Sequence, residues 1–435
     1  MPPAPPKSDD RSPDGELAAR AHALALVEAA LSRRAGIDEA AASPGAHALE
    51  PRQRAFARAI ALIVLRRLAA LDRVLDARLQ KPPPEPVKNL LRLGAAQLLY
   101  MDTPDFAAVN TTVELASTRN ETRPFKGLIN AVLRRLVRER PEDAGPLAPD
   151  WLQARWRAAF GEAGAGLIAD QIPREPPTDL SLKPAIDPGA LAEQLEARVM
   201  PGGSLRVERR GDVAEWPAYG EGSWWVQDAA AAVPARLLDV QPGELALDLC
   251  AAPGGKTLQL AAAGARVTAV DRSAARLRRV SENLARTGLE AEIVTADAGA
   301  WDDPRRFDAV LLDAPCSATG TFRRHPDVLW AARPGDIAKL AGVQSRLLDA
   351  AAERVRAGGR LVYCVCSLEP EEGEAQAADF LRRHPSFARA PIGAGEGGAP
   401  EEAVTPEGDL RILPSHWAEA GGMDGFFVAR FVHGG

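Results

Sequence analysis

From about residue 236 to the C-terminus, short apolar runs alternate with amphipathic stretches, and this alternation constrains the fold more than any other feature of the chain. Alternating strands and helices require right-handed crossovers between parallel strands. The pattern therefore predicts an α/β fold with a doubly wound, Rossmann-like parallel sheet. The apolar runs that we expect as strands are residues 244–250, 265–271, 291–297, 307–315 and 358–366.

Three stretches between these runs have helical spacing, namely residues 257–264, 274–287 and 337–355. The run at 425–432 would add one last strand. The glycine-rich stretch 393–409 has no periodicity, and we expect a mobile loop there.

The N-terminal part has a different organisation. Its apolar residues recur at helical spacing between polar or proline-rich breaks, which predicts an all-α domain over residues 16–140. The expected helices are residues 16–34, 54–79, 84–101, 105–119 and 127–140. Residues 1–15 indicate a disordered tail, and residues 141–150 indicate a linker.

Residues 151–235 mix helical and strand-like segments, so we expect a small α+β module between the helical domain and the sheet domain, which would span 236–435. The helix predicted at 151–161 and the helix at 190–199 flank the strand-like stretch 176–184, and a further strand-like stretch follows at 204–210.

Composition excludes several protein classes. No run of about 18 apolar residues indicates a membrane span, and the N-terminus lacks a signal-peptide pattern. Four cysteines in 435 residues do not form a disulfide framework, which favours a reducing, cytoplasmic compartment. The net charge is −6, but residues 123–140 hold six Lys and Arg against one Glu, and such a local basic face favours a nucleic-acid partner.

Polar residues gather at the predicted carboxyl ends of the strands, where doubly wound sheets bind ligands. Gly254 and Gly255 follow the first strand and permit close backbone approach, while Asp271 and Asp297 end the next two. An isolated Asp after a strand is more often a helix N-cap. Three successive strand ends of this kind favour a nucleoside-containing cofactor, and the absence of a pyrophosphate fingerprint favours S-adenosylmethionine over a dinucleotide.

The fourth and fifth strands end at thiols. Asp313 and Cys316 follow the fourth strand and Cys366 ends the fifth, so all three should face one pocket. For Cys316 alone, a buried structural thiol is as good an interpretation as a functional one. The spacing of the cysteines does not suit a zinc site, and Cys364 and Cys366 are poorly placed for a disulfide within one strand. We expect no metal.

The successive motifs DLCAAPGGKT, AVD, DAPCSATG with RRHPD, LVYCVCSLEPEE and GGMDGFF resemble those of the RNA cytosine-5 methyltransferases of the Sun/NOL1/NOP2 family. Residues 1–150 resemble a NusB-type RNA-binding domain, most clearly at FKGLINAVLRRL. The combination is similar to bacterial enzymes that methylate 16S (small-subunit) ribosomal RNA. It implies a class I methyltransferase sheet, S-adenosyl-L-methionine as cofactor and RNA as partner.

The resemblance also implies roles for individual residues. Cys366 would be the nucleophile that adds to C6 of cytosine, Cys316 would act in product release, and Asp313 would contact N3. Lys256 is a candidate cation for lowering the thiol pKa, or a support for the cofactor. The implied cofactor-binding residues are Cys250, Ala251, Ala252, Pro253, Gly254, Gly255, Lys256, Asp271, Asp297 and Asp313.

The base must leave its stack to reach the sheet edge, which favours single-stranded ribosomal RNA as the substrate. The RNA-binding candidates are Arg323, Arg324, His325, Lys126, Arg134 and Arg135, and for each of these groups an ordinary solvated surface is the competing interpretation. The catalytic residues that the family needs are present, although Val365 stands where the family usually has Thr and Gly373 where Asn is common.

Two alternatives stay open, a transfer RNA substrate and a non-catalytic RNA-binding or ribosome assembly factor on the same fold. Methylation of an exocyclic amine is disfavoured, because such enzymes usually carry Asn/Asp-Pro-Pro-aromatic where this chain has Asp-Ala-Pro-Cys. Nothing in the sequence demands more than a monomer.

Overall fold

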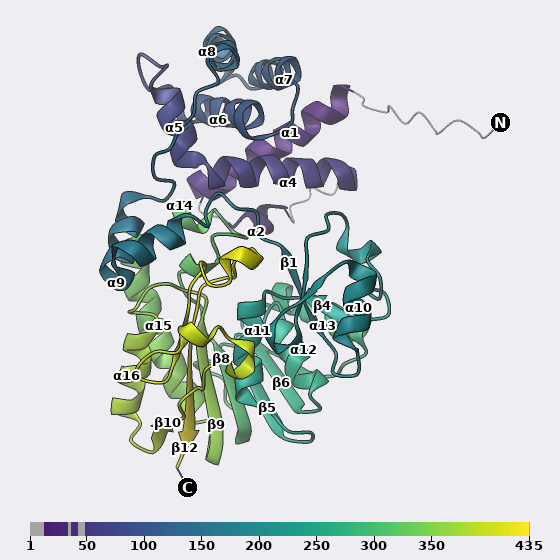
Figure 1. Ribbon diagram of the computed structural model, residues 1–435, viewed down its shortest axis with the longest axis vertical. Coiled ribbons are helices and arrows are strands. Elements are labelled where there is room, and N and C mark those ends of the chain that lie inside the picture. The colour runs from purple at the N-terminus through teal and green to yellow at the C-terminus, as the bar shows by residue number, and fades with distance from the viewer. Residues whose placement is uncertain (1–12, 34–35, 42–47, 435) are drawn as a thin grey trace, which may run out of the picture. The chain divides into compact units, whose positions relative to one another are not determined.

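The computed structural model describes residues 13–33, 36–41 and 48–434. The chain forms two compact units. The first unit contains residues 1–153 and 325–331, and the second contains 154–324 and 332–435. Figure 1 labels many of the elements of both. Residues 1–12 of the predicted tail lie outside the described residues, and helix α1 begins at Pro13. The finer division of the chain into a linker and a separate module stays a prediction.

The central sheet of the second unit has the strand order β10-β12-β9-β8-β5-β6-β7, with β11 paired to β12. Strands β5 to β9 pair in parallel, whereas β12 is antiparallel to β9, β10 and β11. All six predicted strands are confirmed. Their bounds are β5 Leu245–Leu249, β6 Arg266–Asp271, β7 Glu292–Thr295, β8 Phe307–Asp313, β9 Val355–Val365 and β12 Phe426–His433; two short strands, β10 Phe387–Arg389 and β11 Leu410–Ile412, were not predicted.

Helices cover both faces of this sheet, as Figure 1 shows, which confirms the doubly wound α/β prediction. One face packs against α11 (Ala229–Leu238), α12 (Gly255–Ala262) and α13 (Ala274–Thr287). The other packs against α15 (Pro334–Ala352) and α16 (Glu374–Arg383). Helix α15 ends three residues before its predicted end, because the backbone enters β9 at Val355.

The stretch 393–409 does not support the prediction of a mobile loop. It forms two short 3₁₀ turns, η6 (Glu396–Gly398) and η7 (Glu401–Ala403), and it buries Ala399 and Ala403 in the core beside α11. Arg430 of β12 pairs with Glu396 at 2.5 Å. The glycine and proline content of this segment led to the prediction of a mobile loop, but in the structure the segment packs over the hydrophobic core.

A four-stranded antiparallel sheet of order β2-β3-β1-β4 also belongs to the second unit and agrees with the predicted α+β character of 151–235. Its bounds are β1 Thr178–Leu182, β2 Arg198–Val199, β3 Leu205–Val207 and β4 Trp224–Val226, with α10 at Pro188–Leu195. Trp216 and Trp224 are the largest side chains of its core, which also includes Leu180, Leu195 and Leu205. Before it, α9 (Asp150–Ala169) continues past the predicted end, with non-helical backbone at Gly161.

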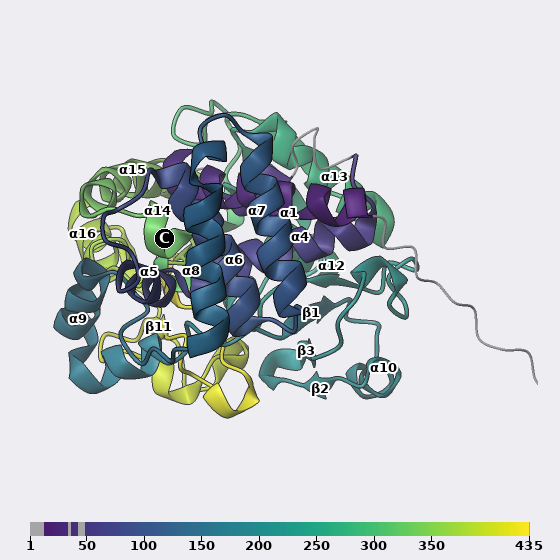
Figure 2. The ribbon, with the colours of Figure 1, turned by 90° about the horizontal axis from the view of Figure 1, so that it is seen from above.

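The first unit is helical and is built around α6, whose residues are buried on almost every side. Helix α6 contacts α1, α4, α5, α7 and α8, and Figure 2 shows α7 and α8 side by side. Residues 325–331 join this unit through α14 (Val328–Ala331), since the Trp330 indole donates a hydrogen bond to the Leu65 carbonyl at 2.8 Å. The remaining bounds are α1 Pro13–Glu28, η1 Ala29–Arg33, α2 Ile37–Ala41, α4 Pro51–Arg66, α5 Leu68–Asp76, α6 Glu85–Tyr100, α7 Asp105–Thr118, η2 Arg123–Phe125 and α8 Lys126–Glu139.

The helix predicted over 54–79 is two helices, because the backbone leaves helical geometry at Arg67, with φ −110° and ψ 14°. Among the described residues, no helix is both long and apolar enough to cross a membrane.

Candidate active site

The turn between β5 and α12 brings backbone close to neighbouring side chains. Cys250 and Gly254 have positive φ values of 62° and 103°. A Cβ on Gly254 would lie 3.0 Å from a methyl carbon of Val280, and one on Gly255 would lie 3.1 Å from the side chain of Gln227. The turn geometry therefore favours glycine at Gly254, and close packing favours a small residue at both positions.

A cavity of about 410 Å³ lies at the carboxyl ends of the strands. Cys250, Asp271 and Asp297, which the sequence singles out, line it together. The other predicted residues of the turn do not line it; Ala252 instead donates its N–H to Asp271 at 3.2 Å. The complete lining is Cys250, Asp271, Arg272, Arg276, Asp297, Ala298, Gly299, Ala300, Pro315, Val343, Arg346 and Leu347.

The two cavity acids differ in burial. Asp271 is 3% exposed and accepts hydrogen bonds from the N–H groups of Ala252 and Ser273. Asp297 is exposed, and its Oδ1 accepts the Gly299 N–H at 2.9 Å. Each acid thus supports its local turn while also lining the cavity, but neither is a helix N-cap, since Ser273 caps α13 and no helix directly follows Asp297. Burial, followed by the charge of Asp313, raises the pKa of Cys250 to about 12, so this wall is a neutral thiol.

Cys316 and Cys366 meet at the ends of β8 and β9, where their Sγ atoms are 3.5 Å apart. The Gly320 N–H donates to the carbonyl of Cys366 at 3.0 Å and ties the two turns together. The hydrogen bond to Cys366 and then burial raise the pKa of Cys316 well above its usual value. This raised pKa favours the protonated form of Cys316.

Cys364 lies one pleat deeper, fully buried on the α11 face of the sheet. Its Sγ is 3.5 Å from Oδ1 of Asp313. Burial, followed by the charge of Asp313, raises the pKa of this thiol well above its usual value. Cys364 is thus a small buried side chain of the sheet.

Lys256 is buried and donates to Oδ2 of Asp313 at 2.8 Å. Burial, the largest single cause, would lower the pKa of Lys256, but the neighbouring groups, led by Asp313, together raise that pKa. The hydrogen bond of the ammonium is with the acid and not with the thiols, so the direct role expected for Lys256 in activating Cys366 is not supported by a contact.

Sequence reasoning missed Asp248, a fully buried acid inside β5. Its Oδ2 accepts from the Thr257 hydroxyl at 2.6 Å, while Oδ1 has no hydrogen-bond partner in the part of the chain that the structure describes. Burial raises the pKa of Asp248 to about 7. The available signal was an acid within the apolar run LALDL.

The predicted phosphate contacts of Arg323 and Arg324 are corrected by the structure. Arg323 is fully buried and donates to the carbonyl of Gly421. Arg324 pairs with the buried carboxylates of Asp228 at 2.6 Å and Asp424 at 3.4 Å. Because their donors are directed into the protein, both arginines hold the turn after β8 in place.

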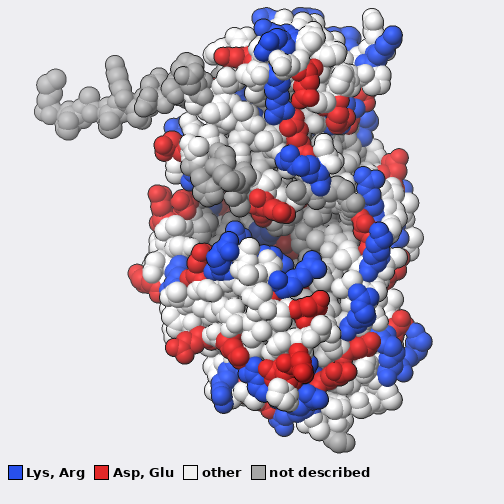
Figure 3. Space-filling model, turned by 180° about the vertical axis from the view of Figure 1, so that it is seen from behind, with Lys and Arg blue, Asp and Glu red and all other residues white. Residues whose placement is uncertain are grey.

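The other RNA-binding candidates belong to the first unit. Nδ1 of His325 lies 3.5 Å from Oδ2 of Asp38. Lys126, Arg134 and Arg135 are exposed on α8. Figure 3 shows cationic and anionic side chains interspersed over one face of the molecule. A helix whose exposed charged side chains are mostly basic, such as α8, therefore indicates an RNA-binding surface better than the net charge of the chain does. Among the described residues, no cluster of His, Cys, Asp and Glu could hold a metal ion.

Comparisons with known proteins agree with this architecture. Residues 235–432 match the family described as 16S rRNA methyltransferase RsmB/F, and residues 17–138 match the NusB family. The ribosomal RNA small subunit methyltransferase B of Sodalis glossinidius is 38% identical over 413 residues, which are 88% of this chain and 90% of that protein.

Two solved structures share the fold. The crystal structure of PH0851 has a TM-score of 0.78, with 24% identity, and the match covers 97% of this chain and 99% of that one. NSun6 from Pyrococcus horikoshii, solved with SFG, has a TM-score of 0.56 and 22% identity, over 66% of this chain and 98% of that one.

Proposed function

The chain belongs to the 16S rRNA methyltransferase RsmB/F family, and from this premise we propose that it methylates C5 of one cytosine in small-subunit ribosomal RNA through a covalent adduct with Cys366. The observation that carries this proposal is the approach of Cys316 and Cys366 to 3.5 Å at adjacent strand ends. The wall of the cavity includes Pro315, the residue before Cys316.

The cavity fits S-adenosylmethionine in its chemistry. Asp271 offers carboxylate oxygens for the hydroxyl groups of a ribose, while Pro315, Val343 and Leu347 give the apolar wall that a purine needs. Asp297, exposed at the rim, is available to an exocyclic amine. The bound cofactor supplies an electrophilic methyl group.

The chemistry of the base explains the need for a thiol. C5 of cytosine is a poor nucleophile, and adding the Cys366 thiolate to C6 converts the ring into an enamine that is nucleophilic at C5. The new S–C6 bond places negative charge toward N3 and O2. After C5 is methylated, a base removes the C5 proton, the S–C6 bond breaks, and the thiolate leaves as the C5–C6 double bond re-forms.

Asp313 is proposed to contact N3 during this addition. N3 of neutral cytosine only accepts hydrogen bonds, so the group facing it must hold a proton. The hydrogen-bonded pair of Lys256 and Asp313 can hold that proton, with Lys256 orienting the carboxyl group. Lys256 would thus serve the acid rather than the nucleophile.

Cys316 is proposed to act at product release. Its raised pKa keeps it protonated beside Cys366, and a protonated thiol can return a proton to the departing thiolate or exchange it with the base that removes the C5 proton. This division of labour requires two thiols in contact but in different protonation states.

RNA binding is proposed to use the exposed basic face of α8. Lys126, Arg134 and Arg135 would hold phosphates, while the target base leaves its stack to reach the strand ends. The natural substrate is then a loop or bulge of ribosomal RNA.

Bisulfite sequencing of ribosomal and transfer RNA from cells with and without the gene tests the proposal. We expect one 5-methylcytosine to disappear from small-subunit ribosomal RNA and to return with the wild-type gene. Loss from transfer RNA alone would replace the substrate assignment, and no loss from either RNA would favour a non-catalytic assembly factor.

A further inference from the structure

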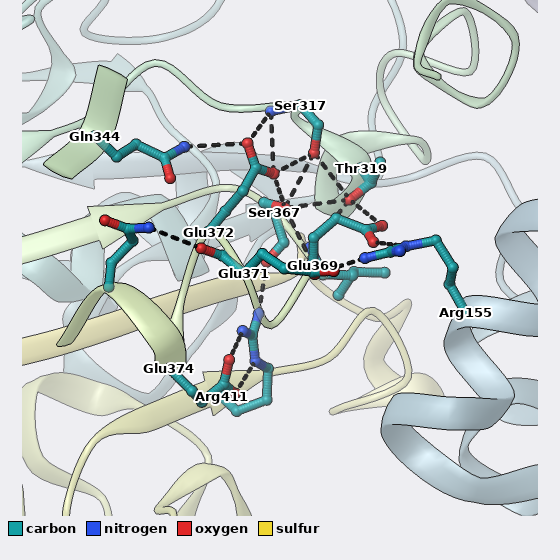
Figure 4. A network of polar contacts seen from close by, with 12 residues as sticks. Arg155, Ser317, Thr319, Gln344, Ser367, Glu369, Glu371, Glu372, Glu374 and Arg411 are labelled. Atoms are coloured by element: carbon teal, nitrogen blue, oxygen red, sulfur yellow. Dashed lines mark hydrogen bonds and ion pairs between the residues drawn. The ribbon is translucent and has the colours of Figure 1, made fainter. Parts of the chain in front are cut away.

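Glu372 is a fully buried acid in the turn after β9. Figure 4 shows its carboxylate at the centre of a polar network. Oε1 accepts from the Ser317 N–H and from Nε2 of Gln344, each at 3.0 Å. Oε2 accepts from the hydroxyls of Ser317 and Ser367, the latter at 2.5 Å. These four donors satisfy a carboxylate that burial would otherwise penalise.

Three of the four donors come from the two turns that carry the thiols. Ser317 directly follows Cys316, and Ser367 directly follows Cys366. Gln344 of α15 also donates to the carbonyl of Pro315 at 3.0 Å, the residue before Cys316. One carboxylate therefore fixes the residues that directly follow both thiols. It contacts these neighbouring residues and not the sulfur atoms themselves.

The turn that presents Glu372 is itself held at several points. The Tyr363 hydroxyl donates to the carbonyl of Glu372 at 2.5 Å. Arg411 donates to the carbonyl of Ser367 at 2.6 Å and pairs with Glu374. Arg155 of α9 pairs with Glu369, which also accepts from Thr319. These contacts hold the turn, and with it the Glu372 carboxylate, in one position.

The negative charge of the Glu372 carboxylate has a second effect. The four donors to Glu372 are neutral groups. After the hydrogen bond to Cys366, burial and the charge of Cys366, the Glu372 carboxylate adds to the causes that raise the pKa of Cys316. Negative charge beside one of two thiols helps to keep that thiol protonated.

We propose that Glu372 is a positioning residue that sets the approach of the Cys316 and Cys366 thiols. The inference rests on the proposed function for its catalytic meaning, since it assigns Glu372 to the geometry on which adduct release depends. The approach of the two thiols that it assigns to Glu372 can be tested without RNA.

Disulfide formation between the two thiols measures their approach directly. Diamide oxidises two thiols to one disulfide, and its N=N bond takes up the two hydrogens. In the wild-type protein the 3.5 Å approach should allow Cys316 and Cys366 to join, a bond that peptide fragmentation locates. The rate of this reaction at limiting diamide is the readout.

Glu372→Ala removes the carboxylate that joins the two turns, and Glu372→Gln replaces one of its acceptor oxygens with a donor. Both variants should therefore slow disulfide formation, and Glu372→Ala should slow it by about tenfold or more. The matched control is Glu371→Gln, which changes a neighbouring acid that is 50% exposed and pairs with Arg155. We expect the control to react within about twofold of wild type, as for a surface ion pair.

The single variants Ser317→Ala and Ser367→Ala each remove one arm and serve if the Glu372 variants do not fold. Equal rates in all folded variants would overturn the inference. The pH profile of Cys316 alkylation should shift to lower pH in Glu372→Gln, which a purely structural role does not require. Methylation of RNA by the wild type is scored separately, so failure of the proposed function leaves the disulfide result interpretable.

Discussion

The Sγ atoms of Cys316 and Cys366 lie 3.5 Å apart across fifty residues of sequence. Parallel strands β8 and β9 bring them together, because both thiols follow the carboxyl ends of adjacent strands. By contrast, Cys364 is closer to Cys366 in sequence but is buried one pleat deeper. The functional pair is thus defined by the sheet.

The cofactor cavity makes a prediction about Asp271. Asp271→Asn should lower the affinity for S-adenosylmethionine by about 10- to 100-fold, since it removes the charge from a buried hydrogen-bond acceptor. Isothermal titration calorimetry measures the change. Asp302→Asn, at an exposed acid outside the cavity lining, should bind as wild type. Equal affinities for both variants would remove Asp271 from the cofactor site.

Asp248 should make stability depend on pH. Its folded-state pKa of about 7 lies above the ~3.9 of an unfolded Asp, so the folded state binds the proton more tightly. The stabilisation is complete below about pH 4 and is lost as the pH rises to about 7.

Asp248→Asn should therefore gain stability relative to wild type between pH 5 and pH 8, by on the order of 1–3 kcal/mol. Urea unfolding at the two pH values measures the difference. The exposed control Asp302→Asn should leave the pH dependence unchanged. A constant difference between Asp248→Asn and wild type would show that Asp248 is ionised in the folded state throughout this range.

Arg324 should prove structural. Arg324→Ala leaves the buried carboxylates of Asp228 and Asp424 without their main partner, which should cost about 3–5 kcal/mol of unfolding free energy. The control Arg210→Ala breaks a pair whose arginine is 85% exposed and should cost less than about 1 kcal/mol. An Arg324→Ala protein of normal stability but weakened RNA binding would restore the phosphate role.

The basic face of α8 should contribute to RNA affinity. Replacing Lys126, Arg134 and Arg135 with Gln should reduce the slope of log affinity against log salt by about 2, if all three contact phosphates. Filter binding to a small-subunit ribosomal RNA transcript measures the slope.

Stability should be unaffected by these three changes, because the side chains are exposed. Arg382→Gln, at a side chain that is 75% exposed on α16, is the single-charge control. An unchanged slope in the triple variant would mean that α8 is only a solvated surface.

The site was predictable where one physical rule applied to each residue separately. Apolar runs predicted the strands, and the rule that ligands bind at carboxyl ends placed Asp271, Asp297 and the two thiols at one edge. The resemblance then supplied roles that neither periodicity nor spacing could assign.

The burial of Arg323 and Arg324 could not be read from sequence, since the carboxylates that face Arg324 come from residues 228 and 424, each about 100 residues away. Glu372 escaped notice for a related reason. It stands in an acidic run that resembles solvent-exposed sequence, and only the fold shows that its donors follow the two thiols.

The most direct measurement is the covalent adduct between protein and RNA in two cysteine variants, resolved by denaturing electrophoresis. If Cys366 adds to C6 and Cys316 serves release, Cys316→Ala should accumulate the adduct while Cys366→Ala forms none and does not methylate. Accumulation of the adduct in Cys366→Ala, with none in Cys316→Ala, would contradict the account and exchange the roles of the two thiols.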